Sequence, residues 1–194
     1  QLPQCAAVVD PHRPDRTYPH TMLSGVGIAF KLAAALSGDQ DAVARRYCDL
    51  ICLGTIADVM TLQGENRRLV VMGLEALRQP QRLGLRALIH ACGCEEQEIT
   101  AGTIGYILAP RVNAAGRMEQ AELAVRLFLT QDPQEADRLA ETLCRLNRER
   151  QTIESEIYSE AVSRLHGAPD GAIVLDDVTI TEDDYGAIYF SSGT

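Results

Sequence analysis

Residues 48–77, CDLICLGTIADVMTLQGENRRLVVMGLEAL, hold the most informative pattern of the chain, two apolar runs joined by a polar loop. The apolar residues recur at helical spacing on both sides, which predicts two helices separated by a break in TLQGEN. Asp58 lies between Ala57 and Val59, at the end of the first run. Burying a carboxylate among such neighbours is costly unless a cation or hydrogen-bond donors meet it. The stretch therefore predicts a helix pair and a partner for Asp58.

Periodicity leaves two interpretations of Asp58 open. An aspartate near a helix end commonly accepts hydrogen bonds from nearby backbone N–H groups. The alternative is a functional carboxylate, because a GTIADV turn, a polar loop and GENRR follow one another at this point.

Length and charge set wide bounds. The 194 residues are 46% apolar, enough for one domain, or one and part of another. The net charge is −9, but residues 1–130 carry 13 acids and 13 bases, and residues 131–194 carry 14 acids and 5 bases. A local basic groove can still bind a polyanion, so charge excludes little.

The chain starts at Gln1 without Met, which suggests a fragment. No run has the length of a membrane span and no leader precedes the first apolar run, so a soluble chain is expected.

The rest of the pattern is mostly helical. A short strand is expected within residues 1–10, before a Pro-rich turn. Helices are expected over residues 24–38, closed by Gly38, and over residues 84–93. A further helix starts near residue 100, and Pro110 should stop it, leaving RVNAAGRM as a loop.

A long helix is predicted from Asp132 to about residue 166. Asp132 followed by Pro133 is an N-terminal signal. Arg150 occupies one slot of an apolar stripe that comprises Ala136, Leu139, Leu143, Leu146, Ile153 and Ile157. Such a helix would be about 50 Å long. Both a bundle helix and a rigid connector between two domains fit this pattern.

The cysteines and histidines give no strong metal signal. The six cysteines lack the usual spacing of a zinc site, so reduced, packed thiols in a cytoplasm are the favoured interpretation. The histidines of the turn at residues 10–20 have no ligand spacing either.

A second constellation is APRVNAAGRM, residues 109–118. Arg111, Asn113 and Arg117 lie among small residues that permit close backbone approach. Guanidinium groups bind phosphate through a planar fork, which favours phosphate recognition. A solvated loop whose arginines pair with Glu119 or Glu122 is the alternative.

The three stretches AAVVDPHRPDRTYPHTMLSGVGIAFKL, YCDLICLGTIADVMTLQGENRRLV and LAPRVNAAGRM occur in this order. Together they resemble the RecJ family of single-strand-specific DNA exonucleases, in the DHH phosphoesterase superfamily. The resemblance covers residues 1 to about 166. It implies an α/β class, with this fragment mostly helical and ending in a long connecting helix. Residues 1–130 would be the C-terminal part of the catalytic domain, and residues 131–166 the connector.

The resemblance also implies a mechanism. Family members use Mn2+ or Mg2+ to hydrolyse single-stranded DNA from its 5′ end, in DNA repair and recombination. By this resemblance Asp58 is a catalytic metal ligand, and Arg111, Asn113 and Arg117 contact nucleic acid. The implied partners are single-stranded DNA and a repair helicase or single-strand-binding protein, with no membrane involved. The implied compartment is the cytoplasm.

Both ends depart from the family pattern. The Asp-x-Asp and Asp-His-His ligands of the family would lie upstream of Gln1, so the fragment alone is expected to be inactive. Residues 170–194 instead resemble the start of the nucleotide loop of adenylate-forming acyl-CoA ligases. We therefore expect either a junction of unrelated sequences near Ala168 or a divergent hairpin over residues 167–194.

Three alternatives remain. One is a phosphodiesterase of the same superfamily that acts on oligonucleotides or cyclic dinucleotides. Another is a non-catalytic helical module that binds DNA or protein. The third, suggested by the tail alone, is a ligase fragment.

Overall fold

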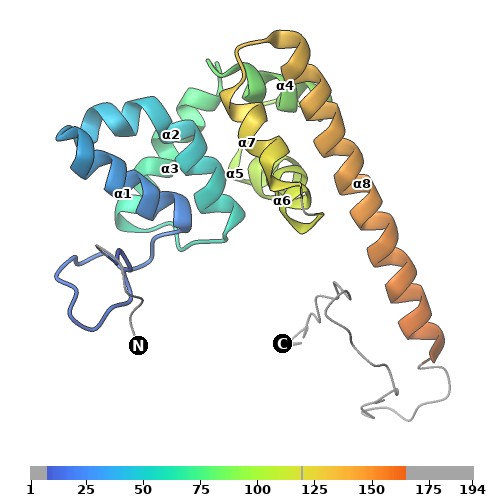
Figure 1. Cartoon of the computed structure of the whole chain (residues 1–194), viewed down its shortest axis with the longest axis horizontal. Helices are drawn as coiled ribbons and strands as arrows, with labels where there is room; N and C mark the ends of the chain where they lie inside the picture. The colour runs from blue at the N-terminus through green and yellow to red at the C-terminus, as the bar shows by residue number, and fades with distance from the viewer. Residues whose placement is uncertain (1–7, 119, 165–194) are drawn as a thin grey trace. The chain divides into compact units, whose positions relative to one another are not determined.

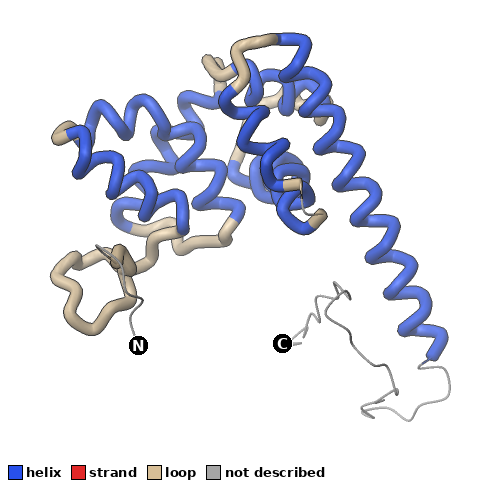
Figure 2. Tube along the Cα trace, in the orientation of Figure 1, coloured by secondary structure: helices blue, strands red, loops and turns tan. Residues whose placement is uncertain are grey.

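The regular structure in the described part of the chain is helical. A computed structural model describes residues 8–118 and 120–164, and no strand occurs within them (Figures 1 and 2). The prediction of a mostly helical fragment is confirmed, while the α/β class stays a prediction. Residues 1–7 of the expected opening strand, and the tail with its ligase resemblance and expected junction, lie outside the described residues. The elements are α1 (Gly25–Ser37), α2 (Gln40–Ala57), α3 (Gly64–Leu77), α4 (Leu83–Ala91), α5 (Ala101–Thr103), the π-helix η1 (Ile104–Leu108), α6 (Ala109–Arg117), α7 (Ala121–Leu129) and α8 (Pro133–Arg164).

Helix caps and a left-handed glycine set the ends of α1 and the start of α2. The Ser24 hydroxyl caps α1 by accepting a hydrogen bond from the Gly27 N–H at 3.3 Å. At the other end Gly38 has φ of 72°, a left-handed conformation that glycine adopts without strain. The Asp39 carboxylate then caps α2 by accepting from the Ala42 N–H at 2.9 Å. The predicted end of the first helix at Gly38 is confirmed.

Helices α2 and α3 pack at unusually short range. A Cβ placed on Gly73 of α3 would lie 2.2 Å from the Cys52 Cβ and 2.3 Å from the Cys48 carbonyl oxygen. Only glycine permits this approach, because any side chain would overlap the backbone of α2. Ile51 and Leu69 are buried beside it in a small core that α1 completes with Phe30. The helix pair predicted from residues 48–77 is confirmed.

A larger core joins the later helices. Buried side chains from α2, α3, α4, η1, α6, α7 and the first half of α8 form one cluster. Helices α4 and α7 also approach closely, since a Cβ on Gly84 would lie 1.9 Å from the Leu127 carbonyl oxygen. Cys52 is fully buried in this cluster, and burial raises the pKa of its thiol to about 12. It packs as a small neutral side chain.

Helix α8 begins where predicted. The Asp132 carboxylate accepts from the Gln134 N–H at 3.0 Å, and the helix runs to Arg164. Leu143 and Leu146 of the stripe are 0% and 1% exposed, whereas Ile153 and Ile157 are 45% and 54% exposed. The first half of the helix therefore packs as a bundle helix.

The chain divides into two compact units, Gln1–Thr152 and Ile153–Thr194, and α8 begins in the first and ends in the second. Among residues 8–118 and 120–164, no helix is both long and apolar enough to cross a membrane.

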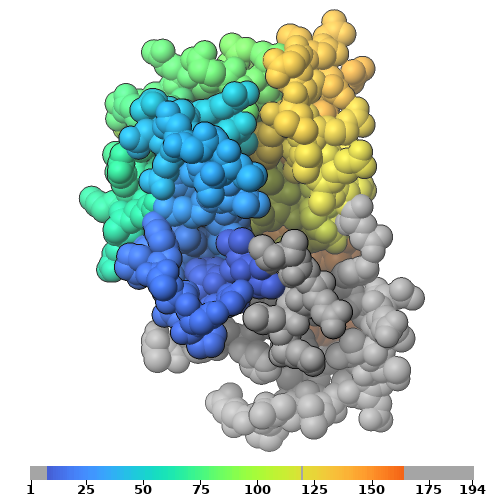
Figure 3. Space-filling view, turned by 60° about the vertical axis from the view of Figure 1, so that its left-hand side comes forward, coloured from blue at the N-terminus to red at the C-terminus, as the bar shows by residue number. Residues whose placement is uncertain are grey.

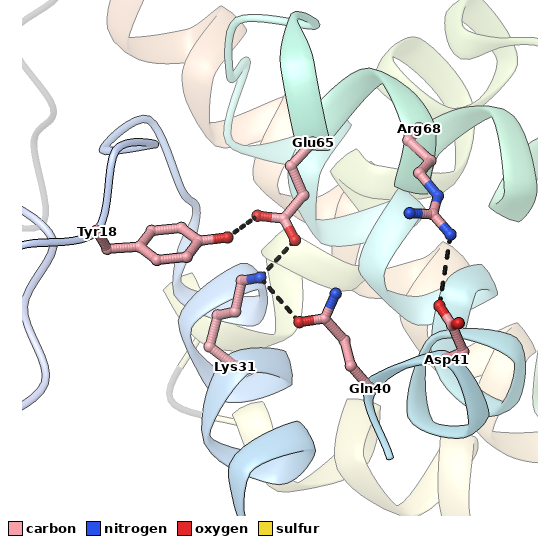
Figure 4. A network of polar contacts seen from close by, with 6 residues as sticks. All are labelled: Tyr18, Lys31, Gln40, Asp41, Glu65 and Arg68. Atoms are coloured by element: carbon pink, nitrogen blue, oxygen red, sulfur yellow. Dashed lines mark hydrogen bonds and ion pairs between the residues drawn. The ribbon is translucent and has the colours of Figure 1, made fainter. Parts of the chain in front are cut away.

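The loop before α1 is attached to the helices by a polar network (Figure 4). The Tyr18 hydroxyl donates to Glu65 Oε2 at 2.8 Å, and Lys31 of α1 pairs with the same carboxylate. Burial alone would lower the pKa of Lys31, but the bonds to Glu65 and Tyr18 outweigh it and raise that pKa. This loop and helices α1 and α2 face the viewer in the space-filling view (Figure 3).

We expect Gly73→Ala to lower the free energy of unfolding by about 3 kcal/mol, because the methyl group must push α3 away from α2. Thermal and urea unfolding followed by circular dichroism measure it. The matched control is Gly116→Ala in α6, where a Cβ meets nothing within 4 Å. This control should be neutral or stabilising by up to about 1 kcal/mol. Equal stability of the Gly73→Ala variant and the unsubstituted chain contradicts the close-packing account.

Candidate functional site

Asp58 lies where α2 ends and the chain turns. It is the C-terminal cap of α2, its backbone N–H donates to the Gly54 carbonyl at 3.0 Å, and its side chain is exposed. The sequence-based premise that this carboxylate is buried is therefore wrong. The physical reason is that the apolar run stops being helical at this residue, so the chain leaves the core for solvent.

The residue after Asp58 is conformationally unusual. Val59 has φ of 52°, the only non-glycine residue with positive φ in the described ranges, and its side chain is 89% exposed. A β-branched residue is strained in this left-handed region. The left-handed conformation of Val59 turns the chain out of the helical path directly after Asp58, which lies at the exposed end of α2. Strained backbone of this kind often occurs at functional sites.

The loop after Asp58 is held by Asn66 at the start of α3. This asparagine is 1% exposed. Its Nδ2 donates to the Thr61 carbonyl at 3.1 Å and also to the Met22 carbonyl. One buried amide thus joins the turn at residues 58–63 to the loop before α1. Asn66 has a structural role that the sequence pattern did not reveal.

As a metal site, Asp58 stands alone in the described residues. Its carboxylate makes no hydrogen bond or ion pair there, and an exposed carboxylate suits a hard cation such as Mg2+ or Mn2+. However, no group of three or more His, Cys, Asp or Glu side chains in these ranges could hold a metal ion. Asp58 could therefore supply one ligand, and the others would have to come from elsewhere.

The predicted loop at residues 111–118 is wrong, because α6 (Ala109–Arg117) continues through it. Pro110 falls in the first turn of α6, directly after η1. There the Ala109 N–H donates to the Ile104 carbonyl in the wider i→i−5 pattern of a π-helix. A proline is tolerated in a first turn because its missing N–H is not needed there.

Helix α6 separates the three residues expected to bind nucleic acid. Arg111 is half-buried, and its Nη1 donates to the Ile107 carbonyl at 2.5 Å. Asn113 and Arg117 are both exposed and lie four residues apart, so they share one face of the helix. Arg111 is two residues before Asn113 and points to another side. The structure therefore brings Asn113 and Arg117 together and directs Arg111 inward.

The inward guanidinium of Arg111 lies near a pair of thiols. Cys92 Sγ and Cys144 Sγ are 4.0 Å apart, which joins the end of α4 to α8. Burial and the neighbouring Cys144 raise the pKa of Cys92 to about 12, and the charge of Arg111 acts in the opposite direction. The Nε of Arg111 is buried without a hydrogen-bond partner. Arg111 thus contributes to the packing of this region.

The end of α2 and the π-helix are in contact. A Cβ on Gly105 of η1 would lie 3.5 Å from Ile56 Cγ2, at ordinary van der Waals distance, and α2 also packs against α6. The turn that carries Asp58 and the helix that carries Asn113 and Arg117 therefore belong to one packed body.

No family model matches the sequence. The curated relatives include the single-stranded-DNA-specific exonuclease RecJ of Bacillus subtilis, 44% identical over 90% of this chain, and that of Thermus thermophilus, 36% identical over 87% of it. The chain spans 22% and 27% of those two proteins.

Solved structures agree. The crystal structure of Thermus thermophilus RecJ in complex with Mn2+ matches with a TM-score of 0.65 and 39% identity, covering 80% of this chain and 23% of that one. A manganese-bound exonuclease RecJ matches with a TM-score of 0.65 and 38% identity, covering 78% and 38% of the two chains. The class that this chain resembles is thus that of single-stranded-DNA-specific exonucleases. Within that class the relatives and structures are RecJ, and the resemblance read from the motifs is confirmed over most of the chain.

We expect Arg111→Met to lower the free energy of unfolding by about 1–2 kcal/mol, because it removes the charged donor of the Ile107 carbonyl. Asn113→Ala, an exposed change on the same helix, should leave stability within about 0.5 kcal/mol. Chemical denaturation of both variants measures the difference. If both variants unfold like the parent chain, Arg111 has no structural role.

Proposed function

We propose that the chain is a segment of a metal-dependent 5′→3′ single-stranded-DNA exonuclease that acts in DNA repair and recombination. The observation that carries this proposal is the joint agreement in sequence and fold with RecJ proteins, including manganese-bound structures. The complete protein would have the α/β fold of the DHH superfamily. In it residues 1–130 form the helical C-terminal part of the catalytic domain, and residues 131–166 form the connecting helix.

In this proposal Asp58 supplies one carboxylate to a site for Mn2+ or Mg2+. Such ions activate a water molecule and stabilise the charge on the phosphoryl oxygens. The exposed, unpaired carboxylate at the end of α2 supports this role, as does the strained turn that directs it outward. Asp58 therefore has to orient its oxygens towards a position shared with ligands from the rest of the protein.

Helix α6 would contact the substrate backbone. Asn113 and Arg117 share an exposed face, where an amide and a guanidinium can donate to phosphate oxygens. Arg111 would act from the same helix, with one nitrogen already committed to the Ile107 carbonyl. The proposed partners are single-stranded DNA and a repair helicase or single-strand-binding protein, and the proposed compartment is the cytoplasm.

A non-catalytic helical module that binds DNA is the second candidate. The observation in its favour is that Asp58 has no companion ligands in the described ranges. The two functions differ in metal binding, since a scaffold has no reason to hold Mn2+ at the end of α2.

We expect sub-stoichiometric Mn2+ to broaden the amide NMR signals of Asp58 and its neighbours. The affinity should be weak, with a Kd on the order of 1 mM, because one carboxylate holds the ion. Asp58→Asn should abolish the local broadening. The control Asp137→Asn, an exposed aspartate of α8, should leave it unchanged. Equal broadening in the Asp58→Asn variant contradicts the metal role.

The 194-residue chain alone should not digest single-stranded DNA. A single carboxylate cannot assemble a two-metal site, so no turnover is expected with Mn2+ or Mg2+. Incubation with a 5′-labelled oligonucleotide and gel analysis measures it. Mn2+-dependent release of nucleotides that Asp58→Asn removes would show that the fragment carries a complete site.

A further inference from the structure

A groove rich in arginine lies on the first unit, away from the turn that carries Asp58. It has a volume of about 890 Å3 and is formed by the first half of α2, the end of α3, the connection to α4 and the end of α7. Four arginines line it, and they come from distant parts of the sequence: Arg45, Arg46, Arg78 and Arg82. Two acids, Asp49 and Glu75, line it as well.

Arg82 is held rigidly in this groove. Its Nε donates to Asp49 Oδ2 at 2.9 Å, and its Nη2 donates to the Arg46 carbonyl at 2.8 Å. Its guanidinium also lies 5.2 Å from the centre of the Tyr47 ring. Asp49 is 7% exposed, and its negative charge is neutralised by this internal ion pair with Arg82. The pair joins the start of α4 to α2 and leaves the remaining cations to face solvent.

The positive charge that remains belongs to Arg45 and Arg46. Arg78 is balanced by Glu75 at 3.2 Å and Glu98 at 3.0 Å. Arg46 lies 5.5 Å from the Tyr47 ring centre, and neither Arg45 nor Arg46 has an ion pair within the described residues. Both residues are exposed and line the groove, so each guanidinium group can bind an anionic group there bidentately.

The rest of the lining suits a polar, repeating anion. Neutral side chains that can donate or accept hydrogen bonds surround the arginines: Gln79, Gln81, Thr130 and Gln131. Large apolar side chains are few, with Leu83 and Phe128 in the lining. The groove offers little apolar surface for an apolar helix or strand of a partner to pack against. A phosphodiester backbone, in contrast, offers oxygens that accept hydrogen bonds from both the amides and the guanidinium groups.

The groove lies within reach of one nucleic-acid strand that also approaches Asp58. Arg45 and Asp58 are 13 residues apart, and α2 joins them, so they lie about 20 Å apart along the helix axis. A stacked strand covers that distance with roughly six nucleotides.

We propose that Arg45 and Arg46, with the groove behind them, form a second contact for the sugar-phosphate backbone of single-stranded nucleic acid. The choice of nucleic acid as the ligand rests on the proposed function. The contact needs no metal ion and does not read base sequence, because it is made to phosphates. It keeps the strand on the protein away from the turn that carries Asp58.

The test is fluorescence anisotropy with a labelled 20-nucleotide oligothymidylate, in EDTA, over a range of salt concentrations. The double variant Arg45→Glu/Arg46→Glu should bind at least about 10-fold more weakly than the parent chain. Its plot of log K against log salt should be shallower by about 1.4, the value expected for two lost phosphate contacts on a single strand. Circular dichroism checks that the variant is folded.

The matched control is Arg138→Glu/Arg148→Glu, which changes the net charge equally at two exposed positions of α8 outside the groove. It should weaken binding less than about 3-fold, since only long-range attraction is lost. Equal weakening by both pairs, or no binding by the parent chain, overturns the inference. So does displacement of the DNA by an oligoglutamate peptide of matched charge at equal concentration.

A failure of the proposed function has a different signature. If Asp58 does not bind metal, Asp58→Asn leaves the broadening of the amide NMR signals by Mn2+ unchanged. The groove still binds the oligonucleotide in EDTA. If the groove does not bind nucleic acid, Arg45→Glu/Arg46→Glu leaves the affinity for the oligonucleotide unchanged, while the metal-dependent broadening at Asp58 persists.

Discussion

The contact between α2 and α3 at Gly73 is the constraint on which the candidate site depends. With no side chain at this position, α3 lies directly against Cys48 and Cys52 of α2. The two helices are joined by a short, sharply turned connection, residues 58–63, which contains the left-handed Val59 and is held by the buried amide of Asn66. Asp58 is exposed because it falls at the start of that connection. Its position therefore follows from where α2 ends and the chain turns back to α3.

The same principle applies to α6. Once η1 widens the helix ahead of Pro110, the motif RVNAAGRM continues as a helix, with one arginine inward and one outward. A loop could have presented all three polar side chains in one direction, whereas the helix turns Arg111 to a different side from Asn113 and Arg117. The motif thus combines a residue that supports the local packing, Arg111, with two exposed residues on one face of the helix, Asn113 and Arg117. Its small residues serve the packing, since Ala114 and Ala115 are both fully buried.

Much of the helical pattern could be predicted because its signals are local. Gly38 and the Asp132–Pro133 pair each act on the backbone beside them, and the apolar stripes mark the faces that pack, although Ile153 and Ile157 of the α8 stripe are exposed. The helix through Pro110 could not be predicted from the motif, because it begins behind a π-helix, which the spacing of apolar residues does not indicate. The exposure of Asp58 could not be predicted either. Its sequence neighbours are apolar, but α2 ends at Ala57 and leaves Asp58 at the exposed end of the helix. The arginine groove has no sequence signature, as its members come from residues 45–46, 78 and 82.

The central claim is that Asp58 is a metal ligand of a RecJ-type exonuclease, and a chimera tests it most directly. Residues 8–164 would replace the matching segment of Bacillus subtilis RecJ, the 44% identical relative, which supplies the rest of the protein. Mn2+-dependent release of nucleotides from single-stranded DNA is then measured with and without Asp58→Asn. The account predicts an active chimera that loses at least about 100-fold of its rate with the substitution, because a ligand of the catalytic metal is removed. An active chimera that keeps its full rate with Asp58→Asn would contradict it.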